Sequence, residues 1–297
     1  MTETEMKQGT LIRGFGGFYV VVDGEGCEYT LRCKKKFRRM KLSPLVGDEV
    51  MFTPGSGEEH GWLEEILPRT SECLRPPVAN VALLLIVVAP VPEPDLLLVD
   101  RMMVRARAQQ MDMLLVINKC DLDESLADEL RAQYAGANVQ VCPVSAKSGR
   151  GLGELKTLMG SRLCCLTGQS GVGKSTLLNA LFGLGLETGE ISRKIQRGKN
   201  TTRHAELLMQ DGMRVLDTAG FSLLELDGGM EPITLKEYYP EFADHEGECR
   251  FEPCYHDREP GCSVTAACGA GEIHPARLAR YRELLAEVKP AWRDRSE

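Results

Sequence analysis

The sequence predicts an α/β fold in three parts: a small β-barrel over residues 1–70, an α/β domain over residues 71–225, and a cysteine-rich region over residues 226–297. The first part consists of short runs of β-forming residues separated by glycine-containing turns. The second alternates apolar strands with helices, a pattern typical of a parallel sheet covered on both faces. The third has little apolar sequence and is rich in Pro, Cys, His and acidic residues, so we expect a bound metal to stabilise it.

The overall composition is that of an ordinary globular protein. Of 297 residues, 43% are hydrophobic and 27% are charged, and the formal net charge is −7. Residues 1–9 do not resemble a signal peptide, and the longest apolar run, residues 81–89, is about half the ~20 residues that span a bilayer. We therefore expect a cytoplasmic monomer that does not enter a membrane. Eleven cysteines, an odd number, in a reducing compartment make disulfides improbable.

The first part contains five expected strands, which suit a closed barrel. The OB-fold is the commonest such barrel that binds RNA, although an SH3-like barrel would produce nearly the same pattern. Residues 32–41 carry seven positive charges and no acid, and we expect Lys34, Lys35 and Lys36 in a loop between strands. Such a run either contacts nucleic-acid phosphates or is a solvated face, and residues 192–204 form a second one. The expected strands cover residues 9–13, 18–22, 28–33, 49–53 and 61–66.

The second part contains the strands and helices of a sheet that binds ligands at the carboxyl ends of its strands. Asp95 is expected to cap the first helix. The expected strands cover residues 81–89, 113–117, 139–144, 163–166 and 214–216, and the expected helices cover residues 95–110, 124–134 and 175–182.

One of the loops after these strands, residues 168–175, reads GQSGVGKS and fits the phosphate-binding pattern GxxxxGK[ST]. Glycines let the backbone wrap around phosphates, and successive N–H groups at a helix N-terminus attract anions. Lys174 is expected to reach the β- and γ-phosphates, and the Ser175 hydroxyl to bind Mg²⁺. The expected nucleotide-binding residues here are Gly168, Gln169, Ser170, Gly171, Val172, Gly173, Lys174, Ser175 and Thr176.

The base is read by a second loop, because Asn118, Lys119 and Asp121 complete the pattern NKxD. The Asp121 carboxylate can accept two hydrogen bonds from the Watson–Crick edge of guanine, which adenine cannot donate. We expect Asn118 to tie loops together and the Lys119 stem to cover the base. This pattern nearly excludes an ATPase or a kinase.

Two further loops complete the expected site. Ser145, Ala146 and Lys147 fit the second guanine loop, in which the Ala146 N–H would bond the guanine carbonyl. Asp217 and Gly220 fit DxxG, with Asp217 on Mg²⁺ through water and the Gly220 N–H near the γ-phosphate.

The four motifs occur in circularly permuted order. Ordinary small GTPases have the phosphate loop first and the two guanine loops last, whereas here both guanine loops precede the phosphate loop. This order, the GQSGVGKS and DTAGF segments, the N-terminal barrel and the Cys/His-rich tail together resemble the RsgA (YjeQ) family over nearly the whole chain. The resemblance implies an OB-fold, a circularly permuted P-loop GTPase domain and a zinc-binding helical domain. It also implies the small (30S) ribosomal subunit and its 16S rRNA as partners, in late subunit maturation, and slow GTP hydrolysis that the subunit stimulates.

A metal site is predicted from four residues with the spacing C-x4-C-x-H-x5-C. Three thiolates and one imidazole form a closed tetrahedral set, which is typical of one structural zinc, although a cysteine-rich chain can produce such spacing by coincidence. The family's zinc pattern matches the same residues. They are Cys249, Cys254, His256 and Cys262. Cys268 and the other cysteines receive no role.

The position of the attacking water is the least defined part of the site. Phe221 follows Gly220 where many GTPases have a water-orienting glutamine, and Asn200 stands where the family typically has a histidine. Asn200 can hydrogen-bond water, and His204 is a possible substitute. One of Thr201 and Thr202 should bind Mg²⁺. Since no base is evident, a nucleotide-switched RNA-binding scaffold with incidental hydrolysis is the rival interpretation.

Overall fold

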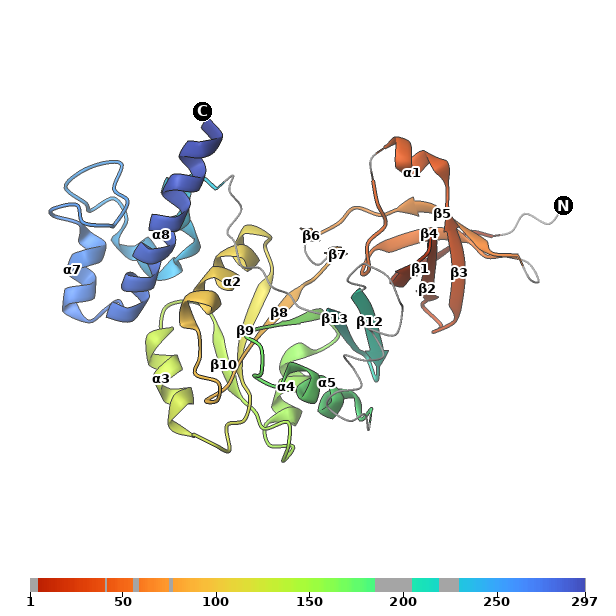
Figure 1. Cartoon of the computed structure of the whole chain (residues 1–297), viewed down its shortest axis with the longest axis horizontal. Coiled ribbons are helices and arrows are strands. Elements are labelled where there is room, and N and C mark those ends of the chain that lie inside the picture. Colours follow the sequence, from red (N-terminus) through yellow and green to blue (C-terminus); the bar gives the residue numbers. More distant parts are fainter. Residues whose placement is uncertain are drawn as a thin grey trace. The chain divides into compact units, whose positions relative to one another are not determined.

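The computed structural model describes residues 5–40, 42–55, 59–74, 77–184, 205–218 and 230–296 (Figure 1). The chain divides into two compact units. The first comprises Met1–Leu84, Lys156–Leu166 and Phe182–Phe221, and the second comprises Leu85–Leu155, Thr167–Leu181 and Ser222–Glu297. The division into domains at residues 70 and 225 stays a prediction.

The predicted N-terminal barrel is confirmed as a closed five-stranded barrel with the strand order β1-β2-β3-β5-β4. β3 pairs in parallel with β5, whereas β1 closes the barrel by pairing antiparallel with β4. Fully buried side chains such as Val21, Leu31 and Leu63 fill the interior. The strands are β1 (Lys7–Phe15), β2 (Phe18–Asp23), β3 (Glu28–Cys33), β4 (Glu49–Thr53) and β5 (Gly61–Ile66).

The basic run between β3 and β4 forms a short helix, α1 (Lys35–Arg39), where we expected a loop. The reason is Phe37, which is 3% exposed and anchors the turn in the hydrophobic core. Lys35, Lys36 and Arg39 remain exposed on this helix. These three basic side chains therefore face solvent, as predicted, but they project from a short helix instead of a loop.

A six-stranded sheet with the order β10-β9-β8-β11-β13-β12 forms the α/β part of the fold. β10 pairs in parallel with β9, and β11 pairs in parallel with β13. The edge strand β12 is antiparallel to β13, so the expected all-parallel sheet is wrong at this edge. The strands are β8 (Leu83–Val88), β9 (Asp112–Ile117), β10 (Gln140–Pro143), β11 (Leu163–Thr167), β12 (Ala205–Gln210) and β13 (Met213–Thr218).

The helices that accompany these strands include α4, which the sequence pattern did not predict. Asp95 caps α2 as predicted, because its carboxylate accepts the Leu98 N–H at 2.9 Å. The helices are α2 (Leu96–Ala108), α3 (Ser125–Gln133), α4 (Leu152–Met159) and α5 (Lys174–Phe182), and a separate two-stranded sheet contains β6 (Glu72–Leu74) and β7 (Pro77–Ala79).

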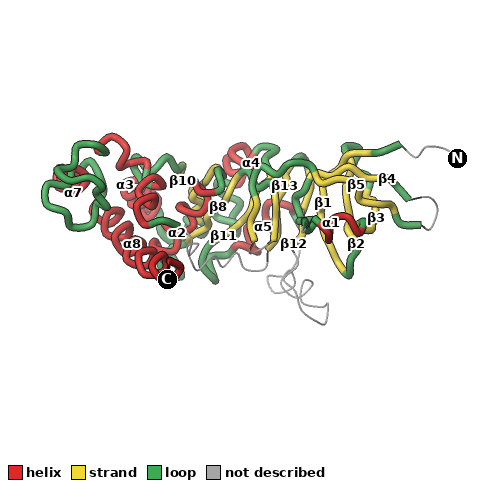
Figure 2. The backbone as a smooth tube through the Cα atoms, turned by 90° about the horizontal axis from the view of Figure 1, so that it is seen from above, coloured by secondary structure: helices red, strands yellow, loops and turns green. Residues whose placement is uncertain are grey.

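The described residues of the C-terminal region, 230–296, are helices and loops without a strand (Figure 2). α8 (Pro275–Ser296) continues through Pro290, and α7 (Ser263–Ala270) precedes it. α7 escaped prediction because its N-cap is the thiol of Cys262 rather than a hydroxyl or carboxylate side chain. Two 3-10 helices, η1 (Pro232–Tyr238) and η2 (Pro240–His245), complete the region.

A buried ion cluster joins α8 to α2 within the second compact unit. Asp100 of α2 is 0% exposed. Its carboxylate accepts hydrogen bonds from Arg280 Nε at 2.6 Å and from the Tyr134 hydroxyl at 2.7 Å, and it pairs with Arg277 Nη1 at 2.6 Å. Arg277 Nε also donates to Glu241 at 2.7 Å. One carboxylate thus holds two cations and connects α2 and α8 with the C-terminal end of α3, while Glu241 attaches η2 to the same cluster through Arg277.

Asp100→Ala should destabilise the protein strongly, because it leaves the guanidinium groups of Arg277 and Arg280 buried with too few acceptors. We expect a loss of about 3–5 kcal/mol of unfolding free energy in urea denaturation, with faster hydrogen exchange in α2 and α8. Asp95→Ala, which removes only the cap of the same helix, should cost about 1 kcal/mol. Equal effects of the two substitutions would contradict a central role for Asp100.

No helix in the described ranges combines the length and the apolarity that crossing a bilayer requires.

Candidate functional site

The predicted phosphate loop lies between β11 and α5, where a strand-loop-helix unit was expected. Gly168, Gly171 and Gly173 have φ values of 134°, 83° and 92°, which side chains rarely adopt. At Gly168 a Cβ atom would also lie 2.1 Å from the carbonyl oxygen of Val87. Only glycine permits this path, which turns the backbone around the N-terminus of α5.

The ammonium group of Lys174 lies across this loop. Its Nζ donates to the carbonyl oxygens of Gly168 at 2.7 Å and Gln169 at 2.8 Å. Burial lowers the pKa of Lys174. Ser175 and Thr176 follow in the first turn of α5 and are half-buried. A cation and the N–H groups of a helix N-terminus therefore converge on one place, which is the electrostatic requirement for binding an anion.

Asn118 connects the phosphate loop to the loop that contains Ala146. Its side chain is buried, and its Nδ2 donates to the carbonyl oxygens of Val172 at 2.9 Å and Gly173 at 3.3 Å. Its Oδ1 accepts the Ala146 N–H at 3.1 Å. At Gly173 a Cβ atom would lie 2.5 Å from Asn118 Nδ2, so the approach depends on glycine. Three of the predicted motifs therefore meet at one amide.

Lys119 also connects its loop to the phosphate loop, at the surface of the site. Its Nζ donates to the carbonyl oxygens of Gly171 at 2.8 Å and Val91 at 2.6 Å, and its backbone has a φ of 58°. The sequence pattern did not indicate Val91, because no motif marks the loop between β8 and α2. The Lys119 stem spans from the 118–121 loop to the crest of the phosphate loop.

Asp121 is exposed and held in its ionised form. A hydrogen bond from the buried Ser145 is the main reason that its pKa is lowered, and the positive charges of Lys147 and Arg150 act in the same direction. An ionised carboxylate is an acceptor only, so it can receive two N–H donors side by side. Arg150 is a contributor that no sequence motif identified.

Other predicted site residues lie outside the described residues. They are Asn200, Thr201, Thr202, His204, Gly220 and Phe221. The backbone of Asp217 is described, and it pairs with Glu206 across the β12–β13 hairpin.

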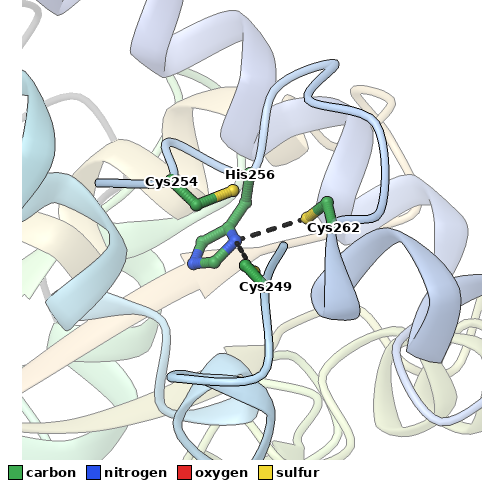
Figure 3. Close-up of side chains that lie close together, drawn as sticks. All are labelled: Cys249, Cys254, His256 and Cys262. Atoms are coloured by element: carbon green, nitrogen blue, oxygen red, sulfur yellow. Dashed lines mark hydrogen bonds between the residues drawn. The ribbon is translucent and has the colours of Figure 1, made fainter. Parts of the chain in front are cut away.

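The four predicted metal ligands do come together, with their ligand atoms all within 4.8 Å of one another. His256 Nδ1 lies 3.4 Å from Cys262 Sγ and 3.7 Å from Cys249 Sγ, and Cys254 points into the same space (Figure 3). A tetrahedral zinc with ordinary Zn–S and Zn–N bonds would place an imidazole nitrogen about 3.6 Å from each sulfur. The donor set and its spacing therefore fit zinc.

Neighbouring groups orient these ligands. Cys249 Sγ lies 3.0 Å from the Ser263 hydroxyl, and Cys262 Sγ accepts the Thr265 N–H at the start of α7. Burial raises the pKa of the Cys254 thiol to about 12, so a metal must displace its proton on binding. His256 has a φ of 55°, and its Nε2 is buried with no partner among the described residues.

Comparison with known proteins agrees with this arrangement. Residues 66–227 match the family described as RsgA GTPase, and residues 8–63 match the RsgA N-terminal domain. The chain belongs to the RsgA GTPase family. It is therefore a GTPase, a hydrolase that acts on GTP.

RsgA relatives resemble the chain over nearly its whole length. A protein of Ruminiclostridium cellulolyticum named small ribosomal subunit biogenesis GTPase RsgA is 41% identical, with 96% of this chain and 94% of the relative covered. The crystal structure of YjeQ from Thermotoga maritima is 34% identical and superposes with a TM-score of 0.83, covering 96% of this chain and 99% of that one. YloQ, described as a circularly permuted GTPase, is 31% identical with a TM-score of 0.80 and 98% of both chains covered.

Asp121→Asn should change the base preference of this RsgA GTPase, because an amide offers a donor where the carboxylate accepts. We expect the preference to move from GTP toward xanthosine triphosphate in competition binding. Asp123→Asn is the matched control, since the contacts described for Asp123 are with its neighbours Ser125 and Leu126, and the base preference of this variant should stay with GTP. Full GTP selectivity in Asp121→Asn would mean that another group reads the base.

Proposed function

We propose that this GTPase acts in late maturation of the small (30S) ribosomal subunit, where the subunit stimulates its hydrolysis of GTP. The observation that carries the GTPase part of this proposal is the Asn118 amide, which joins the phosphate loop to the predicted guanine loops in a member of the RsgA family. The relatives named small ribosomal subunit biogenesis GTPase supply the subunit as partner. We place the protein in the cytoplasm, acting as a monomer.

In this proposal, each step of GTP binding and hydrolysis is assigned to a residue of the chain. Lys174 holds the β- and γ-phosphates, and Mg²⁺ is bound by Ser175, by one of the two threonines at 201–202 and, through water, by Asp217. The Gly220 N–H contacts the γ-phosphate, and Asn200 orients the attacking water. Phosphoryl transfer depends on positioning and charge more than on proton abstraction, so an amide is sufficient for this role.

Base recognition is assigned to the loops around Asp121. Asp121 accepts the guanine N–H donors, and the Lys119 stem covers the base. The Ala146 N–H is already bonded to Asn118 Oδ1 at 3.1 Å, so it can serve the guanine carbonyl only as a shared donor. Ser145 supports the site indirectly through its hydrogen bond to Asp121, and Lys147 through its charge.

The RNA contacts of the protein are assigned to the barrel. α1 presents Lys35, Lys36 and Arg39 to solvent, and Lys34 pairs with Glu64 beside it. We propose that these cations contact 16S rRNA phosphates, since clustered Lys and Arg attract a nucleic-acid backbone even when a protein is acidic overall.

The metal cluster is proposed to bind one structural zinc ion through Cys249, Cys254, His256 and Cys262. Four protein ligands leave no open position for catalysis, so zinc supplies folding energy to the C-terminal region and no chemistry. The cluster adjoins a hydrophobic core that includes Phe242.

The rate of GTP hydrolysis with and without purified small subunits tests the function. We expect strong stimulation of the unaltered protein, and Asn200→Ala should lower the stimulated rate at least tenfold, about 1.4 kcal/mol, with GTP affinity little changed. His204→Ala should do much less. If subunits do not stimulate the unaltered protein, the rival function is favoured, a nucleotide-switched RNA-binding scaffold with incidental hydrolysis. If Asn200→Ala and the unaltered protein have equal stimulated rates, another group positions the water.

Removing one zinc ligand should loosen the tail and spare nucleotide binding. Cys254→Ser should lose the metal, measured by elemental analysis, and become sensitive to protease after residue 226, while GTP affinity stays within a few-fold. Cys268→Ser is the control, because Cys268 lies outside the ligand set and should retain one zinc per chain. A protease-resistant tail after chelation would refute a structural zinc.

Replacing Lys34, Lys35 and Lys36 together with Ala should weaken binding to the small subunit. For single-stranded nucleic acid, each lost phosphate contact lowers the slope of the logarithm of the binding constant against the logarithm of the salt concentration by ~0.7. The loss of three contacts should therefore lower the slope by about 2. An unchanged slope would mean that the basic helix is only a solvated face.

A further inference from the structure

Charged side chains join the barrel to the β12–β13 hairpin, within the first compact unit. Arg13 of β1 pairs with Glu206 of β12 at 3.5 Å. On β13, Arg214 Nη2 donates to Glu49 Oε1 of β4 at 3.0 Å and to the Thr10 hydroxyl of β1 at 3.2 Å. Both strands of the hairpin are therefore held by the barrel.

β12 needs such a partner because it is the last strand of the six-stranded sheet. An edge strand presents unpaired backbone groups, and β1 lies against this one. Charged side chains connect β1 and β4 to the hairpin at this joint. A cavity of about 530 Å³ opens beside it, with Thr10, Asp23, Glu49, Met209 and Arg214 in its lining. Close packing is what makes a protein interior rigid. The contact between the barrel and the hairpin consists of ion pairs beside a cavity, so the hairpin can shift against the barrel.

The hairpin connects two segments to which the proposed function assigns Mg²⁺ and the γ-phosphate. β12 begins at Ala205, three residues after Thr202, and β13 ends at Thr218, directly after Asp217. Glu206, which pairs with the barrel, stands opposite Asp217 in the hairpin register. A small shift of the hairpin against the barrel therefore moves the backbone that positions Asp217.

We infer that Arg13, Glu49, Glu206 and Arg214 are positioning residues for GTP hydrolysis, through which the barrel sets the place of the β12–β13 hairpin. RNA bound to the barrel is then coupled to the nucleotide site, and this is the route by which the subunit stimulates hydrolysis. The inference rests on the proposed function. Because the hairpin lies between the barrel and the residues assigned to the nucleotide, we expect the bound nucleotide to alter the barrel as well.

The test replaces the two carboxylates, because an acid does not attract RNA and its loss cannot weaken binding through a lost phosphate contact. In Glu49→Gln combined with Glu206→Gln, small-subunit affinity and the KM for GTP should stay within threefold. The subunit-stimulated kcat should fall at least fivefold, about 1 kcal/mol in barrier height. Glu65→Gln, an exposed carboxylate of the same barrel, is the control and should keep full stimulation.

A charge reversal separates positioning from a general structural effect. Arg214→Glu alone should lose stimulation, and adding Glu49→Arg should restore most of it, because the pair is rebuilt with opposite polarity. No recovery in this double variant, together with unchanged stimulation in the double glutamine variant, would overturn the inference.

A second measurement needs no ribosomal particle. Hydrogen exchange at β1 should differ between the protein loaded with GDP and with β,γ-imido GTP, and the double glutamine variant should lose this difference. If the unaltered protein shows the difference but is not stimulated by subunits, the proposed function fails and the coupling stands. If subunits stimulate both proteins equally and β1 does not respond to nucleotide, the coupling fails and the proposed function stands.

Discussion

The proposed nucleotide site depends on one buried side-chain amide, that of Asn118. Both halves of this amide are used: its nitrogen donates to the phosphate loop, and its oxygen accepts from the 145–147 loop. A buried amide with a lost partner carries a desolvation cost, so the two loops are held in the one arrangement that satisfies it. The Asn118 amide has a fixed size, so its hydrogen bonds set the distance between the phosphate loop and the 145–147 loop. Lys119 adds a second bridge to Gly171 at the surface.

Permutation leaves this arrangement intact because it depends on where strands end and not on how they are connected. The half of the sheet with the predicted base-reading loops, β8 to β10, is contiguous in the chain, and so is the half with the predicted phosphate and Mg²⁺ motifs, β11 to β13. Exchanging the order of two contiguous halves alters only one connection. The barrel precedes these two halves in the chain and the metal-bearing tail follows them. Side-chain contacts join the barrel to the β12–β13 hairpin and the tail to α2.

The sequence predicted strands and motif loops well, and it failed where long-range contacts decide the structure. β3, β4 and β5 begin and end where alternating β-forming residues indicated. β12 was missed because Ala205–Gln210 consists mainly of residues that favour helices, although the following Asp211 and Gly212, with φ values of 51° and 79°, are a hairpin signal. The nucleotide motifs are local patterns and were readable. The effect of Arg150 on Asp121, and the pairing of Asp100 with arginines far along the chain, arise only after folding.

The Asp100 cluster has a consequence for the order of biosynthesis. A chain emerges from its N-terminus at roughly 5–20 residues per second and folds domain by domain, so α2 is made well before α8. Asp100 is separated from Arg280 by 180 positions and has 0% exposure once both are in place. Until α8 arrives, this carboxylate interrupts the face of α2 that α8 will cover, and the unit that binds the nucleotide is incomplete. α8 thus completes the second compact unit, so this unit can fold fully only after the metal-binding residues 249–262, which precede α8, have also been synthesised.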